Sequence, residues 1–287
     1  MPGLQPTMLS ALTLATAMLS AATAHSAALL EIQPGMARPG DAILIRIRGV
    51  ASVPTGKLGG RQLAFFPGPG GYWALVALEL EQAPGELLVS VTEPSESSEE
   101  EITGSVTVVE PNFNRRELTV AKRFIHPSAA ERRWLAEDQA VLERAYDRPT
   151  EPPLFTQNFR WPRQSTITGR FGDLRLLNGA KDSQHYGVDL DGRTGAPVFS
   201  ANDGEVVLVR RCFASGNTVV IYHGAGLFTA YFHLSQTIAV VGQRVHQGQI
   251  IGAVGRTGRV TGPHLHWAAK VAKLYVDPES LLRLKFK

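Results

Sequence analysis

Three short strings near the C-terminus carry side chains suited to metal chemistry. They are His185 to Asp189, Tyr231 to Leu234 and His264 to His266, and together they hold four histidines and one aspartate. Residues two or four apart in a strand point to the same face, so the first and third strings can each aim two donors inward from a β-scaffold. A catalytic zinc takes three protein ligands and one open position, and two imidazoles with one carboxylate are a common set. Two histidines then remain for proton transfer.

The sequence around these strings, from about Ile167 to Leu282, resembles the lysostaphin/LytM-type zinc endopeptidases, which cut peptidoglycan cross-bridges. Several further short runs carry the resemblance: Arg170-Phe171-Gly172, Gly195 to Val198, Asp203 to Val207, Ser215 to Ile221, Gly242 to Val245, Gly248 to Gly252 and Thr261 to Trp267. It covers roughly two-fifths of the chain. The resemblance implies one zinc ion per chain, with His185, Asp189 and His266 as metal ligands and His233 and His264 as catalytic residues.

The division of labour between the two remaining histidines follows from the missing glutamate. The helical His-Glu-x-x-His metalloproteases use a glutamate as their base, and this cluster brings none. Histidine titrates nearest to neutral pH, so it is the group suited to take a proton from water. Our hypothesis is that His264 is the general base and that His233 donates to, or electrostatically stabilises, the oxyanion at the scissile carbonyl.

Other residues have a weaker claim to the site. His223 ends an apolar run, where the family often has a histidine, and contact with the site competes with a structural role. Asn178, Tyr186 and Trp267 are candidates for lining the cleft, with packing or turn structure as the alternative. Cys212 is the only cysteine, so no disulfide forms within the chain, and a buried hydrophobe is its expected role.

The N-terminus has the pattern of an exported protein. Met8 to Ala24 is an uncharged run rich in leucine, alanine, serine and threonine that ends in small residues, which predicts a signal peptide over residues 1–24. No lysine or arginine precedes Arg38, so the usual basic segment is missing, and an uncleaved interfacial anchor is the alternative. We expect export to the periplasm or cell envelope, with no stable membrane span after cleavage.

Two domains are predicted after the signal peptide, in a mainly β fold. Short strands separated by Pro-Gly turns over residues 28–110 favour a small β-sandwich of immunoglobulin-like type. Residues 151–287 are expected to form an antiparallel β-sheet peptidase domain of the LytM type with little helix. Strand-like runs there cover Val206 to Val209, Thr218 to Tyr222 and Leu227 to Phe232.

A linker over residues 111–150 joins the two domains, with a helix predicted at about 128–146. Ser128 followed by Glu131 is a capping box, and an apolar stripe continues to Tyr146. Such a stripe usually docks on a neighbouring domain. A structural strut is the simplest role, and the sharper hypothesis is that this segment or the N-terminal domain covers the cleft in a resting state.

Charge is unevenly distributed between the two domains. Residues 28–110 hold 5 lysines and arginines against 11 acidic residues, whereas residues 151–287 hold 16 against 9, giving net charges of −6 and +7. A basic catalytic domain suits an anionic cell-wall polymer. Nucleic acid is not an expected partner, because the basic residues are dispersed and no nucleic-acid-binding motif is present.

The expected function is therefore a secreted zinc endopeptidase that hydrolyses the stem-peptide cross-links of peptidoglycan. The alternative from another class is a non-catalytic LytM-type regulator of another wall hydrolase, and the complete set of five residues argues against it. A protease that attacks glycine-rich proteins is a further enzymatic alternative. Spacing in the sequence leaves the bond open between D-Ala–diaminopimelate and glycine-containing cross-links.

Overall fold

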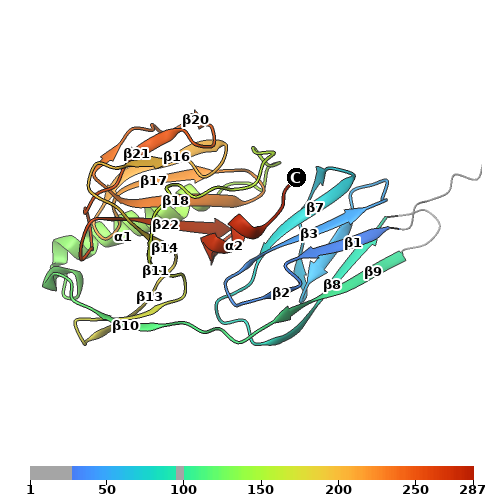
Figure 1. The fold of residues 1–287 in the computed structure, drawn as a ribbon, viewed down its shortest axis with the longest axis horizontal. Coiled ribbons are helices and arrows are strands. Elements are labelled where there is room, and N and C mark those ends of the chain that lie inside the picture. Colours follow the sequence, from blue (N-terminus) through green and yellow to red (C-terminus); the bar gives the residue numbers. More distant parts are fainter. Residues whose placement is uncertain (1–27, 95–99) are drawn as a thin grey trace, which may run out of the picture.

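The computed structural model describes residues 28–94 and 100–287. Figure 1 shows that these residues form two β-rich halves, one N-terminal and one C-terminal. The predicted signal peptide (1–24) lies outside the described residues. The chain is mainly β, as predicted, and α1 (Ala129–Tyr146) is the longer of its two described α-helices. No helix in these two ranges is long and apolar enough to cross a membrane.

The N-terminal half consists of two sheets that face each other. The strands are β1 (Leu29–Gln33), β2 (Met36–Ala37), β3 (Ala42–Arg48), β4 (Thr55–Leu58), β5 (Arg61–Gln62), β6 (Phe65–Gly68), β7 (Gly71–Ala77), β8 (Gly85–Glu93) and β9 (Glu100–Val108). They pair in the orders β1-β3-β7-β6 and β2-β9-β8-β4-β5. Alternation along β3 sends Ile43, Ile45 and Ile47 into a core shared with Val89 and Val106 of the second sheet. The immunoglobulin-like identity of this half stays a prediction.

The opposite face of β3 packs against the C-terminal half. Leu44 of β3 and Trp73 of β7 belong to the same buried cluster as Val188 and Leu265 of the C-terminal half, and the Trp73 ring lies 5.5 Å from that of Phe286. The Ala42 N–H donates to Ser280 Oγ at 2.9 Å, and Ser280 lies on α2 (Pro278–Arg283). Because β3 is buried on both faces, nearly every one of its residues is buried, and the two halves share a continuous apolar contact.

An eight-stranded sheet forms the C-terminal half. Its main strands are β11 (Ile167–Gly169), β14 (Val188–Asp191), β16 (Gly204–Cys212), β17 (Gly216–Tyr222), β18 (Leu227–Leu234), β20 (Arg244–Val245), β22 (His264–Val271) and β23 (Leu274–Val276). The order is β11-β14-β22-β18-β17-β16-β20, with β23 beside β22, and every pair is antiparallel. A small sheet is made of β15 (Pro197–Phe199), β21 (Ile250–Ala253) and β19 (Gln236–Thr237). The predicted strands within residues 206–209, 218–222 and 227–232 are confirmed.

The linker packs closely on the C-terminal half. Its strand β10 (Arg115–Leu118) pairs in parallel with β12 (Leu174–Leu177), which continues into β13 (Lys181–Gln184). After a short 3₁₀ turn (Lys122–Phe124), α1 begins with the predicted capping box, in which Ser128 and Glu131 bond to each other's backbone N–H groups. The Tyr146 ring at the end of α1 lies 5.3 Å from that of Phe228, edge to face. The helix therefore packs on one face of the sheet, against Phe228, Phe232 and Ala268, and Figure 1 shows it beside these strands.

Candidate metal centre

Strand register brings the predicted metal ligands together. β14 and β22 are antiparallel neighbours, and Asp189 lies directly opposite His266. His185 stands just before β14, where its backbone N–H donates to Asp173 O at 3.0 Å and its carbonyl accepts from Gly172 N at 2.8 Å. These bonds fix the segment that carries His185 to the loop between β11 and β12.

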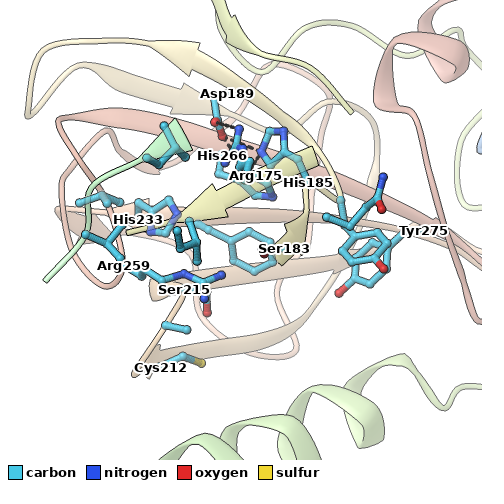
Figure 2. A pocket seen from close by; sticks show the side chains of 18 of the residues that line it. Arg175, Ser183, His185, Asp189, Cys212, Ser215, His233, Arg259, His266 and Tyr275 are labelled. Carbon is cyan, nitrogen blue, oxygen red and sulfur yellow. Dashed lines mark hydrogen bonds and ion pairs between the residues drawn. The ribbon is translucent and has the colours of Figure 1, made fainter. Parts of the chain in front are cut away.

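The three donor atoms lie within hydrogen-bond distance of one another. His185 Nε2 is 3.0 Å from Asp189 Oδ1 and 2.9 Å from His266 Nδ1, and the last two atoms are 2.8 Å apart. Tetrahedral ligands with bonds of about 2.1 Å are about 3.4 Å apart, so a small adjustment admits the metal. A Cβ at Gly187 would lie 2.7 Å from His266 Nε2 and 2.6 Å from Trp267 O, and glycine leaves this space open. The donor set fits zinc (Figure 2).

The charge states of these groups suit metal binding. Burial alone would raise the pKa of Asp189, but the close contacts with His185 and His266 hold it well below its ordinary value. Burial lowers the pKa of His266 to about 4, against the opposing effect of its bond to Asp189. Asp189 is therefore a carboxylate and His266 a neutral imidazole at neutral pH, the forms in which both bind metals.

Neighbouring groups orient the ligands. Arg175 Nη2 donates to Asp189 Oδ2 at 2.6 Å, which leaves Oδ1 to the metal position. His185 Nδ1 is 2.6 Å from the Arg170 carbonyl oxygen; donation there places the proton on Nδ1 and the lone pair on Nε2. A Cβ at position 169 would lie 2.5 Å from Arg175 Nη2 and 2.6 Å from Asp189 Oδ2, so Gly169 makes room for this ion pair.

His233 reaches the site through an irregularity in β18. The register between β17 and β18 shifts between Asn217 and Val219, and His233 has a positive φ of 62°. This bulge places His233 on the site side together with its neighbour Phe232, whose ring stacks on His266 at 5.3 Å. His233 Nδ1 is 2.9 Å from the Thr257 carbonyl oxygen, which as the acceptor of the Nδ1 proton leaves Nε2 open.

His264 has the same arrangement on the next strand. Its Nδ1 lies 2.9 Å from the Gly262 carbonyl oxygen, so Nε2 is again the open nitrogen. Nε2 is 3.6 Å from Asp189 Oδ1, and the ring is 5.0 Å from that of His233. Burial, with the nearby charges of His264 and His266, holds the pKa of His233 well below its ordinary value. Two imidazoles with open Nε2 atoms thus lie beside the three ligands.

These five residues line a cleft of about 810 Å³. One wall comes from α1, including Leu135 and Leu142, and another from β10 and the β12–β13 hairpin. Tyr186 and Tyr275 stack at 5.1 Å and lie at one side of the cleft (Figure 2 labels Tyr275). Within the described residues, the lining begins at Arg116, so the cleft walls come from the linker and the C-terminal half.

The other residues that the sequence suggested for the site lie in different parts of the structure. Tyr186 lines the cleft, whereas Trp267 is fully buried in the core. Asn178 bonds through its side chain to both backbone polar groups of Val120. His223 is fully buried away from the cleft, where Nδ1 contacts the Asp203 carbonyl and Nε2 contacts Thr229 Oγ1. Cys212 is buried at the cleft margin, and burial raises the pKa of its thiol.

Sequence reasoning missed several residues of the cleft. Among them are Arg175 and Arg259, which line it. Arg175 stands ten residues before His185 in a segment with no recognisable ligand pattern, so nothing local marks it. Arg259 lies five residues before His264, and that proximity was the available signal.

A model of peptidase family M23 matches residues 183–278, which include all five clustered residues. The matched part of the chain, residues 183–278, belongs to peptidase family M23. This membership agrees with the resemblance read from the sequence, and the matched segment runs from β13 to the first residue of α2.

Characterised relatives share this M23 segment. ShyA, a peptidoglycan DD-endopeptidase of Vibrio cholerae, is 36% identical over 157 residues, which cover 54% of this chain and 33% of that protein. Mpg, a DD-carboxypeptidase/endopeptidase of Neisseria meningitidis, is 41% identical over 97 residues, covering 34% and 22%. The match thus spans a third or less of these curated relatives. A Pseudomonas aeruginosa crystal structure ascribed to peptidase M23 is 24% identical with a TM-score of 0.62, covering 85% of this chain and 93% of that one, so the fold is shared across both halves.

Proposed function

We propose that this M23 protein is an exported, zinc-dependent endopeptidase that hydrolyses peptide cross-links of peptidoglycan in the cell envelope. The observation that carries the proposal is the cluster of three donor atoms within 3.0 Å of one another beside two histidines with open Nε2 atoms. One zinc ion per chain fits this donor set. Relatives named as peptidoglycan DD-endopeptidases support the substrate. A non-catalytic regulator would have no need of the complete set.

The roles of the two histidines follow from their hydrogen bonds. When bound, zinc supplies Lewis acidity, which acidifies water and polarises the scissile carbonyl. We assign His264 as the base, because its open Nε2 lies near Asp189 Oδ1, an atom of the proposed metal site. From this position Nε2 can take a proton from water at the metal site. His233 donates its Nδ1–H to the Thr257 carbonyl oxygen, so it can donate a hydrogen bond to the oxyanion only when Nε2 is also protonated. His233 therefore stabilises the oxyanion only after its Nε2 has received a proton, and not at the beginning of the reaction.

Single substitutions separate metal binding from proton transfer. His264→Ala should retain zinc while hydrolysis falls by about 10²–10⁴-fold. His266→Ala should lose zinc as well, because a ligand is removed. His246→Ala is the matched control, since His246 is exposed and stands outside the cleft. Zinc content by elemental analysis and release of soluble muropeptides are the measurements. Activity retained by His264→Ala would refute its role.

The substrate is tested by mass spectrometry of muropeptides. Purified sacculi digested with the mature protein should yield monomers from cross-linked dimers, and a chelator should stop the reaction. We expect cleavage at the D-Ala–diaminopimelate bond, in line with the DD-endopeptidase relatives. Cleavage of elastin in preference to sacculi, or digestion unaffected by the chelator, would contradict the proposal.

We also propose that α1 restricts access to the cleft. The helix supplies one wall, whereas none of the cleft-lining residues belongs to the described part of the N-terminal half. Leu142 packs against the sheet from this helix, so Leu142→Ala should loosen the wall and speed the digestion of intact sacculi. Glu137→Ala, an exposed position on the same helix, is the control. An unchanged or slower rate for Leu142→Ala would count against gating by α1.

A further inference from the structure

Arg259 is a cation of the cleft for which the described part of the chain supplies no anion. It lies on the loop between β21 and β22, and Figure 2 shows it beside His233 and near Ser215. In the described ranges, no ion pair or side-chain hydrogen bond holds its guanidinium. The acidic side chains of the cleft have other partners: Asp138 bonds to Arg210, Asp189 to Arg175, and Glu143 to Gln139.

The surroundings of Arg259 favour an anion. Burial lowers the pKa of its guanidinium, and the positive charge of Arg175 lowers it further. A partly buried cation beside a second cation is destabilised until an anion reaches it, and a bidentate carboxylate matches the fork of an arginine. Arg175 differs, because its charge is already matched by Asp189.

The loop that carries Arg259 is held firmly in place. The Arg259 N–H donates to the Ala214 carbonyl at 2.7 Å, and Thr257 Oγ1 bonds to Leu234 O at 2.9 Å. Gly258 has a φ of +77°, and a Cβ there would lie 2.4 Å from the Ala214 oxygen. The loop is thus seated on the β16–β17 turn, so the backbone from which the Arg259 side chain extends is fixed before a ligand arrives.

We propose that Arg259 binds a carboxylate of the peptide substrate beside the scissile bond, and that it selects substrates in which this carboxylate is free. The inference rests on the proposed endopeptidase function and adds a specificity-determining residue to it. Peptides with an amidated carboxyl at this place present a neutral group, which cannot form the charge-assisted pair.

The test compares two cross-linked muropeptide dimers that differ only in carboxyl amidation. Arg259→Gln should lose about 10- to 100-fold in kcat/KM on the free-carboxylate dimer, mainly through a higher KM, and cleave the amidated dimer as the wild type does. Arg259→Lys should recover part of the loss, because it keeps the charge without the planar fork. Arg256→Gln, an exposed arginine on the same loop, should behave as the wild type. Zinc content and thermal midpoint confirm that each variant is folded and loaded.

Two outcomes would overturn the proposal. An equal loss by Arg259→Gln on both dimers would mean that Arg259 acts on a group other than the carboxylate, and no loss would mean that it binds nothing. If the zinc-loaded wild type cleaves neither dimer, the proposed function fails on its own. Calorimetric binding of the free and amidated dimers to His264→Ala, with and without Arg259→Gln, then decides the carboxylate contact by itself.

Discussion

A partly buried carboxyl group at the contact between the two halves makes the stability of this protein depend on pH. Asp277 caps α2, where its Oδ1 accepts from Glu279 N at 2.9 Å, and its own N–H donates to Gly40 O at 2.7 Å. Burial raises the pKa of Asp277 to about 7, and the carboxylate of Asp41 from the N-terminal half adds to the rise. Arg283 opposes it, although that side chain is bonded to Asp41 at 3.1 Å.

The size and sign of the effect follow from that pKa. Between about pH 4 and pH 7 the folded chain keeps a proton that the unfolded chain has lost, because the ordinary pKa of the group is 3.8. The free energy of unfolding therefore falls as pH rises through this window. A difference of about 3 pKa units at 1.36 kcal/mol each amounts to at most about 4 kcal/mol above pH 7. Asp277→Asn removes the ionisation, and asparagine caps a helix about as well as aspartate.

Urea unfolding at pH 4, 6 and 8 measures this directly. Asp277→Asn should be nearly as stable as the wild type at pH 4 and more stable by up to about 4 kcal/mol at pH 8. Asp182→Asn, at an exposed aspartate, is the control and should change little at any of these pH values. A difference between Asp277→Asn and the wild type that is constant from pH 4 to pH 8 would refute the reasoning, as would a loss of stability at pH 8.

Three further substitutions test the supports of the site and the linker. Arg175→Met should weaken zinc binding by about 10- to 100-fold in competition with a chelator, because Asp189 loses its orienting partner; unchanged affinity would dismiss that role. Gly169→Ala should lower zinc occupancy while circular dichroism stays the same, since the added Cβ would meet the same ion pair. Full occupancy would show that the pair has room to shift. Ser128→Ala should cost about 1 kcal/mol of stability in urea by removing the cap of α1, and no cost would mean that packing alone holds this end of the helix.

Much of the fold is visible in the local pattern of the chain. Side chains from Ile43 to Arg48 alternate in the manner of a β-strand, and β3 covers this run. Ser128 with Glu131 marks the start of α1, as the sequence predicts. The ligand strings are equally local, because residues two apart on β22 share a face, as His264 and His266 do.

The rest depends on contacts between distant residues. The approach of Asp189 to His266 is set by the pairing of β14 with β22, which no single segment encodes. His233 needs a backbone bulge to join its neighbours, and alternation alone would place it on the face opposite to Phe232. Arg175 and Arg259 are ordinary basic residues until the fold puts them in one cleft.

The double burial of β3 bears on which part of the protein can regulate the site. Because one face of β3 fills the N-terminal core and the other packs with Trp73 and Phe286, moving the N-terminal half away would expose a large apolar surface. The linker helix is held differently: Leu135 and Leu142 reach the cleft from a helix whose outer face is in water. Only Asp138 and Tyr146 of α1 are buried, against six of the seven residues of β3, so displacing the helix should expose less apolar surface than separating the halves. Opening the cleft by moving α1 should therefore require less free energy than moving the N-terminal half. For this reason the substitution at Leu142 tests gating more directly than removal of the N-terminal half would.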